Sequence, residues 1–196
     1  MPQEFQVHPL LHPYNVPSST YLASLPPSPR PSKLVVGVLL PSPLTKKILL
    51  LKRSENELHY PGIWELPSGK VESGDLTILH AAARECEEET GLSVAEFTAL
   101  GNSFEYSVEG RGRTLQLNFD VRTQGDGDEV RINSEEHQGF KWCDWGEVEE
   151  IGVTERMRGY LRDAFVRWGW MDMESSEYVF VRRGGVLSGH AGLHGE

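Results

Sequence analysis

The chain has 196 residues, enough for one domain with a substantial hydrophobic core and additional terminal segments. Its 29 acidic and 19 basic residues give a formal charge of −10, which argues against a broad electrostatic surface for nucleic-acid phosphates. The two cysteines, Cys86 and Cys143, form no CxxC pair, so the sequence indicates neither a zinc site nor a disulfide framework, and we expect a cytoplasmic protein.

The N-terminal segment, residues 1–32, is rich in proline and serine. Proline lacks a backbone donor and restricts the residue before it, so this composition predicts an extended arm without helix or sheet. The first ten residues lack the basic segment and long apolar run of a secretion signal. The longest apolar stretch, residues 34–40, is too short to span a bilayer, so we expect a soluble protein with no membrane partner.

Five later segments show the patterns of regular structure. The apolar runs KLVVGVLLPSP from residue 33 and KKILLLKRS from residue 46 predict strands that pair as neighbours in a buried sheet. Alternating apolar residues in RTLQLNFDVRT, from residue 113, predict another strand, as does HQGFKWCDW from residue 137. Apolar residues at helical spacing predict an amphipathic helix at 154–170, and these are Met157, Tyr160, Leu161, Ala164, Phe165 and Trp168.

The segment between Thr77 and Thr90 contains neither glycine nor proline, and Gly91 follows where a left-handed C-cap is favoured. It therefore predicts a helix. At about 100° per residue, its apolar residues share one side, and these are Leu79, Ala82, Ala83 and Cys86.

Acidic residues occupy a neighbouring arc of the same helix. Glu85, Glu88 and Glu89 are spaced three and four positions apart, whereas Glu87 points elsewhere, and Arg84 can pair with Glu88 one turn later. Three adjacent like charges destabilise a helix unless a positive charge lies among them. A hard divalent cation such as magnesium supplies that charge and often bridges carboxylates to substrate phosphates. The alternative is a solvated acidic face, which is what most charge runs are.

This segment resembles the Nudix box, GX5EX7REUXEEXGU, in which U is a bulky aliphatic residue. The matching positions are Gly69, Arg84, Glu85, Cys86, Glu88, Glu89, Gly91 and Leu92, and the preceding WELPSG at 64–69 also looks like the family's approach to the box. The resemblance implies the α+β Nudix fold, a mixed β-sheet sandwiched between α-helices. With the composition of the two ends, we expect an arm at 1–32, a Nudix hydrolase domain at 33–182 and a glycine-rich tail at 183–196.

The resemblance also implies residue roles. Glu85, Glu88 and Glu89 match glutamates that bind magnesium or manganese. Arg84 matches an arginine that orients a carboxylate, and the carbonyl of Ser68 matches one that completes a metal shell. The family takes its general base either from the box, here Glu85 or Glu89, or from a later loop.

For that loop we select Glu136 from SEEHQGFKW, where Glu135 and His137 are further candidates. For each of these three residues, solvent exposure is as common a role as catalysis. Substrate-binding residues are not predicted, since core packing is favoured over base stacking for most of Phe104, Tyr106, Trp142 and Trp145.

One departure from the box concerns its first glutamate. Asp75 stands in that place when counting from Gly69, but eight residues instead of seven separate it from Arg84. We place the extra residue in the loop around SGDLT, because an insertion within the helix would rotate its faces by about 100°. Asp75 is then a loop residue or a helix cap.

The resemblance implies a magnesium- or manganese-dependent hydrolase. We expect it to cleave a pyrophosphate linkage in a small nucleoside diphosphate joined to another group. The alternative is a catalytically silent Nudix-fold module that binds a nucleotide or a protein, but such a module is expected to have lost its metal carboxylates. An RNA-directed activity is disfavoured because the sequence has no basic region.

Overall fold

The computed structural model describes residues 3–26, 30–42, 44–108, 112–125 and 129–172. Its elements are, in chain order, β1 (Gln6–Val7), η1 (Pro9–Tyr14), α1 (Ser18–Ser24), β2 (Lys33–Leu39), β3 (Pro41–Ser42), β4 (Lys47–Arg53), β5 (Trp64–Glu65), β6 (Ser68–Lys70), α2 (Ile78–Thr90), β7 (Val94–Val108), β8 (Gly112–Thr123), β9 (His137–Cys143), α3 (Trp145–Glu150) and α4 (Glu155–Arg167). Within the described ranges, no helix has the length and apolar character needed to span a lipid bilayer. The predicted tail at 183–196 lies outside these ranges.

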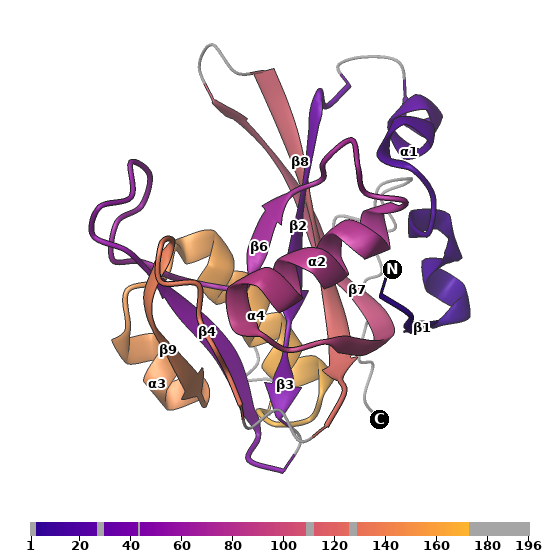
Figure 1. Ribbon diagram of the computed structural model, residues 1–196. Coiled ribbons are helices and arrows are strands. Elements are labelled where there is room, and N and C mark those ends of the chain that lie inside the picture. Colours follow the sequence, from indigo (N-terminus) through magenta and orange to yellow (C-terminus); the bar gives the residue numbers. More distant parts are fainter. Residues whose placement is uncertain (1–2, 27–29, 43, 109–111, 126–128, 173–196) are drawn as a thin grey trace, which may run out of the picture.

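The strands form two sheets. The five-stranded sheet has the order β1-β7-β8-β2-β6, and it is mixed because β2 runs parallel to β8 but antiparallel to β6. In the four-stranded sheet, β4 pairs with β3, β5 and β9. Figure 1 shows α2 lying across one side of the five-stranded sheet and α4 on the other side. The α+β fold with a mixed sheet between helices is therefore confirmed.

The expectation that β2 and β4 pair directly is wrong. The register of β2 is with β8 and β6, whereas β4 belongs to the other sheet. The chain crosses between the sheets after β2, so β4 pairs with the next strand, β3, and not with β2 itself. Both strands are apolar on both faces, and such runs look alike wherever they pair.

Two hydrophobic cores lie on opposite sides of this arrangement. The side chains of Val36 and Val38 pack in the core beneath α2, whereas Leu39 packs in the core beneath α4. Strand β4 divides its residues in the same way, with Leu49 in the first core and Leu50 in the second. Successive side chains of a strand point to opposite faces, so these strands support both helices.

The prediction of an extended N-terminal arm is wrong for residues 6–24. This stretch contains β1, which pairs parallel with β7, followed by the helices η1 and α1. Prolines stand at the starts of both helices, where a missing N–H costs no intrahelical hydrogen bond. Leu11 is buried in the core beneath α2, and Tyr14 packs edge-on against Phe119, so apolar contacts hold the segment in place.

The predicted strand β8 and helix α4 are confirmed, but the polar side of β8 is also buried. Gln116, Asn118 and Asp120 alternate with the apolar residues and are at most 8% exposed. Asp120 accepts hydrogen bonds from Arg167 Nη2 at 2.6 Å and from the Tyr160 hydroxyl at 3.3 Å, both on α4. Helix α4 is therefore held on the sheet by hydrogen bonds as well as by the packing of its apolar side.

Candidate functional site

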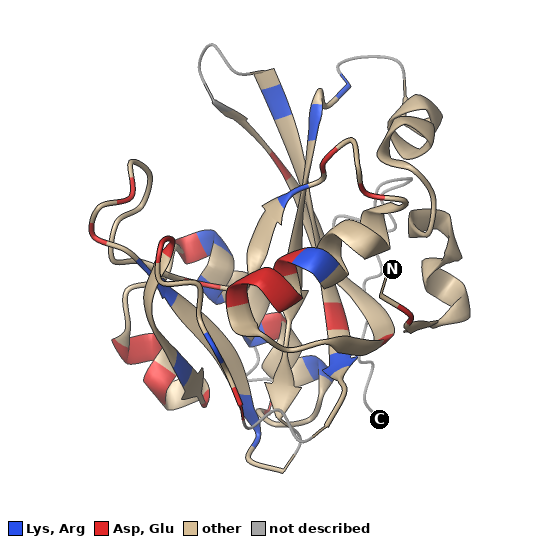
Figure 2. Ribbon diagram, in the orientation of Figure 1, with Lys and Arg blue, Asp and Glu red and all other residues tan. Residues whose placement is uncertain are grey.

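Helix α2 forms as its sequence predicts. The Thr77 side chain caps its N-terminus by accepting a hydrogen bond from the His80 N–H, and Gly91 ends it with a φ of 71°, in the left-handed region that favours glycine. Its predicted apolar face, which includes Leu79 and Cys86, is buried. Figure 2 shows the acidic positions of α2 gathered in its C-terminal half, beside its one basic position. The helix therefore concentrates its charges in its C-terminal half.

Arg84 gathers the carboxylates at the start of this acidic surface. Its Nη1 donates to Glu85 Oε1 and Glu88 Oε2, each at 2.9 Å, as the predicted pairing with Glu88 requires. Two further donors bind Asp75, and Nη2 also reaches the Lys70 carbonyl at 3.0 Å. The hydrogen bonds that Arg84 donates to Asp75 are the largest cause that raises the pKa of Arg84 above its ordinary value. The guanidinium is thus held in place from several sides.

Gly69 creates the space for Glu85. A Cβ added at Gly69 would lie only 2.1 Å from Glu85 Cδ, so the carboxylate occupies the position that any larger residue would take. Burial raises the pKa of Glu85, although the charge of Arg84 opposes this effect. The strand β6 and the helix α2 therefore meet with a carboxylate between them.

Glu89 is the most deeply buried acid of the helix, at 4% exposed. Its Oε2 accepts a hydrogen bond of 2.8 Å from the Ser68 N–H. The pKa of Glu89 is raised to about 9, chiefly by burial. The hydrogen bond from the Ser68 N–H lowers this pKa, whereas the negative charges of Glu65, Glu85 and Glu136 raise it. A carboxylate at this position requires a compensating positive charge to ionise at neutral pH.

The loop before β9 brings Glu136 and His137 to the same place. The Glu136 carbonyl accepts a hydrogen bond from the Ser54 N–H at 2.8 Å, which ties this loop to the end of β4. One carboxylate oxygen each of Glu89 and Glu136 and one ring nitrogen of His137 lie within 4.8 Å of one another. Glu136 is exposed, whereas His137 is 1% exposed.

A second arginine completes the region. Arg53 donates to Glu65 Oε1 at 2.6 Å and to Glu57 Oε2 at 2.8 Å. The carboxylates described in this region belong to Glu57, Glu65, Asp75, Glu85, Glu88, Glu89 and Glu136. Two guanidinium groups do not balance these acids, and the buried members cannot rely on solvent, so the donor set fits a divalent cation with oxygen ligands.

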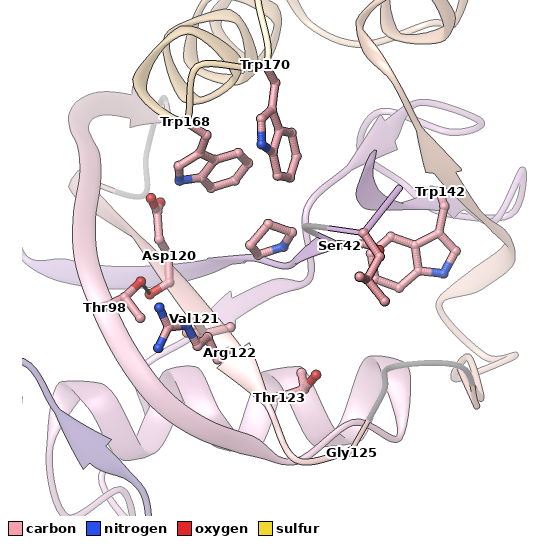
Figure 3. Close-up of a pocket in the computed structure, with 12 residues that line it drawn as sticks. Ser42, Thr98, Asp120, Val121, Arg122, Thr123, Gly125, Trp142, Trp168 and Trp170 are labelled. Carbon is pink, nitrogen blue, oxygen red and sulfur yellow. Dashed lines mark hydrogen bonds between the residues drawn. The ribbon is translucent and has the colours of Figure 1, made fainter. Parts of the chain in front are cut away.

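A separate cavity lies elsewhere in the fold. A cavity of about 510 Å³ is lined by Trp142, Trp168 and Trp170, with Asp120 at its edge, and Figure 3 shows the indole rings extending into it. No predicted site residue is among the residues that line it. Trp142 is five residues from His137 along β9, which corresponds to roughly 17 Å in a strand. The cavity is therefore separate from the carboxylates.

The predicted site residues thus fall into two adjoining groups. Glu85 and Glu88 share Arg84, whereas Glu89 lies beside Glu136 and beneath the Ser68 N–H.

Two residues of this region, Glu65 and Asp75, were not predicted to contribute to it. No pattern along the chain indicates Glu65, whereas the box spacing places Asp75 just before the helix that carries Arg84. The helix cap is Thr77, and Asp75 is therefore a loop residue that holds Arg84.

Comparisons with known proteins agree with this geometry. The family model described as the NUDIX domain matches residues 31–168. The chain is 41% identical over 75 residues to the m7GpppN-mRNA hydrolase NUDT17 of Xenopus laevis, a match that covers 38% of this chain and 25% of that protein. It is 31% identical over 140 residues to Nudix hydrolase 27, chloroplastic, of Arabidopsis thaliana, covering 69% of this chain and 53% of that one. These matches therefore span only a quarter to about half of those two relatives.

Other matches extend over more of the compared protein. The asymmetrical bis(5'-nucleosyl)-tetraphosphatase of Rattus norvegicus is 30% identical over 121 residues, covering 61% of this chain and 78% of that one. The solved structure of the MutT protein from Methanosarcina mazei Go1 has a TM-score of 0.54 at 27% identity, covering 71% of this chain and 94% of that one. The sequence matches and the structural match therefore lead to the same kind of protein.

Proposed function

Because the chain belongs to the Nudix family, we propose that it is a divalent-metal-dependent hydrolase of a pyrophosphate linkage in a nucleoside diphosphate joined to another group. The observation that supports this most directly is the burial of Glu89 beside three other carboxylates. A protein does not gain stability from such an arrangement alone, since like charges in a poorly solvated site repel. The arrangement is useful if these acids bind cations.

Each residue of the proposed site has a distinct part. Glu85, Glu88 and Glu89 hold the metal, and the Ser68 carbonyl adds a ligand. In this site, a bound Mg²⁺ or Mn²⁺ would neutralise charge on the substrate's phosphate oxygens and would lower the pKa of a bound water molecule. Arg84 holds Glu85 and Glu88 at a common point, and Asp75 in turn fixes Arg84. Two acids therefore keep their orientation before a substrate arrives.

Glu136 is the proposed general base. It is exposed at the edge of the site, so it can reach a water molecule that approaches the substrate from solvent, whereas Glu89 lies in the interior. A general base must lie within hydrogen-bonding reach of the water from which it takes a proton. A carboxylate oxygen of Glu136 lies within 4.8 Å of one of Glu89. Glu136 is therefore close enough to the proposed metal site to accept a proton from a water molecule there.

The substrate class is supported by the chemistry that the relatives' names share. One is described as an m7GpppN-mRNA hydrolase and another as a bis(5'-nucleosyl)-tetraphosphatase, so both act on phosphate chains attached to nucleosides. For this chain we propose a small nucleotide derivative, because its net charge of −10 disfavours a long nucleic acid.

Hydrolysis of a mixed panel tests the proposal. The panel contains nucleoside triphosphates, sugar nucleotides and dinucleoside polyphosphates, and the release of phosphate or nucleoside monophosphate is measured with Mg²⁺ or Mn²⁺ and with a chelator. We expect turnover of at least one compound, abolished by the chelator and restored by the metal. Binding of a nucleotide without turnover of any panel member would instead identify a silent binding module.

A further inference from the structure

His137 is an unusual residue for the interior of a protein. It is 1% exposed, and neither of its ring nitrogens has a hydrogen-bond partner among the described residues. Burying a polar group without a partner costs free energy, and most buried side-chain polar atoms have one. A partner supplied by a ligand would remove this cost.

The neighbouring carboxylate of Glu65 does not serve as that partner. Nε2 of His137 lies 3.4 Å from Glu65 Oε1, whereas a charge-assisted N–H···O hydrogen bond measures about 2.7–2.9 Å. The same oxygen already accepts the 2.6 Å hydrogen bond from Arg53. The imidazole is therefore beside an acid whose closest contact is with another group.

The spacing around His137 suits a metal ion. A ring nitrogen of His137 and carboxylate oxygens of Glu89 and Glu136 lie within 4.8 Å of one another. Ligand atoms about 2.0–2.2 Å from one ion lie about 3 to 4.4 Å from one another, so small side-chain rotations bring His137 and Glu89 onto one ion. Glu136 then lies beside that ion, where it remains free to act as the proposed general base. The backbone of His137 is fixed by its pairing with Arg53 of β4, which leaves the ring as the adjustable part.

We propose that His137 coordinates the metal through a ring nitrogen, giving the site a mixed nitrogen and oxygen donor set that favours transition metals such as Mn²⁺ over Mg²⁺. This inference rests on the proposed function, because it assigns a further ligand to that metal site. Imidazole is a softer ligand than carboxylate and contributes more to the binding of first-row transition metals than to the binding of Mg²⁺. An all-carboxylate site lacks this selectivity.

The test uses Mn²⁺ alone, with the full chain and no substrate. Electron paramagnetic resonance first measures how much Mn²⁺ binds, and electron spin echo modulation then detects a ¹⁴N nucleus coordinated to it. We expect ¹⁴N coupling in the wild type and its loss in His137→Gln. The Mn²⁺ affinity of this variant should fall by at least about tenfold, the loss typical of residues that only support a ligand. Mg²⁺ affinity, measured by competition, should fall by less than about threefold because the oxygen ligands remain. His12→Gln, a change at an exposed histidine of η1, should alter neither signal.

The outcomes separate the two proposals. Mn²⁺ that binds the wild type without ¹⁴N coupling would overturn the role of His137 and leave the proposed hydrolase intact. A wild-type protein that binds no Mn²⁺ would overturn both. The wild-type spectrum decides the question even if His137→Gln does not fold, and persistence of the coupling in a folded His137→Gln would also contradict the assignment.

Discussion

Asp75 and Arg84 are joined by two hydrogen bonds, from Nε to Oδ1 at 3.0 Å and from Nη2 to Oδ2 at 3.1 Å. Although burial opposes it, these bonds and the Glu72 N–H hold the pKa of Asp75 below its ordinary value. The pair links the loop before α2 to the arginine that contacts Glu85 and Glu88. Asp75 therefore contributes to the site by positioning Arg84, without a place among the proposed ligands.

The first prediction concerns this pair. We expect Asp75→Asn to lower kcat by about tenfold, the size of effect seen when residues supporting a metal site are changed, because the amide weakens the hold on Arg84. Steady-state kinetics measures this, and metal affinity measured by calorimetry should fall with it. A loss as large as that of a direct ligand would mean that Asp75 itself reaches the metal.

The second prediction uses Gly69. We expect Gly69→Ala to displace the Glu85 carboxylate and to reduce turnover by about a hundredfold or more, since the added Cβ would lie 2.1 Å from Glu85 Cδ. The fold should persist, because the group that must move is the end of a flexible side chain. Gly74→Ala is the matched control in the loop that follows β6, where no neighbouring atom lies within 4 Å of the added Cβ. Equal activity of the two variants would contradict the proposed role of Glu85.

The third prediction is a pH dependence of stability. The folded-state pKa of Glu89 is raised to about 9 from an ordinary value of 4.5. The folded metal-free protein therefore favours protonated Glu89 more than the unfolded chain does. The stability that this preference contributes is fully present below pH 4.5. It is lost as the pH rises towards 9, by up to about 1.4 kcal/mol per pH unit.

Thermal unfolding in chelator at several pH values measures this loss. Added Mg²⁺ should raise Tm more at pH 8.5 than at pH 6, because at low pH the metal must displace a proton. Glu89→Gln should remove the fall in Tm with rising pH that Glu89 causes in the metal-free protein. The same fall in Tm in that variant would show that other groups cause it.

Sequence patterns predicted those parts of this structure that depend on neighbours along the chain. The cap residues and spacing of α2 specified its limits and the arc shared by Glu85, Glu88 and Glu89. Contacts across the sheets carried no such signal, because Glu65 and His137 are separated by 71 residues and meet only after β4, β5 and β9 pair. The N-terminal helices were missed because proline content outweighed the few apolar residues, such as Leu11, that anchor the segment.

The fourth prediction concerns the buried Asp120, whose side chain is 2% exposed and accepts the 2.6 Å hydrogen bond from Arg167. We expect Arg167→Met to lower the free energy of unfolding by about 2 kcal/mol, because it leaves a buried carboxylate without its charged partner. Denaturant unfolding measures the change. Arg122→Met is the control, since Arg122 pairs with Glu96 while itself 72% exposed, and it should cost no more than about 1 kcal/mol. Equal effects would contradict the importance of the buried pair.

The most direct test of the account compares turnover in three variants of α2 on whichever panel compound the wild type hydrolyses. Glu88→Gln and Glu89→Gln each remove a proposed ligand charge at nearly constant volume, whereas Glu87→Gln makes the same change at an exposed position outside the proposed site. We predict that kcat falls by at least about a hundredfold in the first two variants and stays near the wild-type value in the third. Wild-type kcat in both Glu88→Gln and Glu89→Gln would contradict a metal site on this helix.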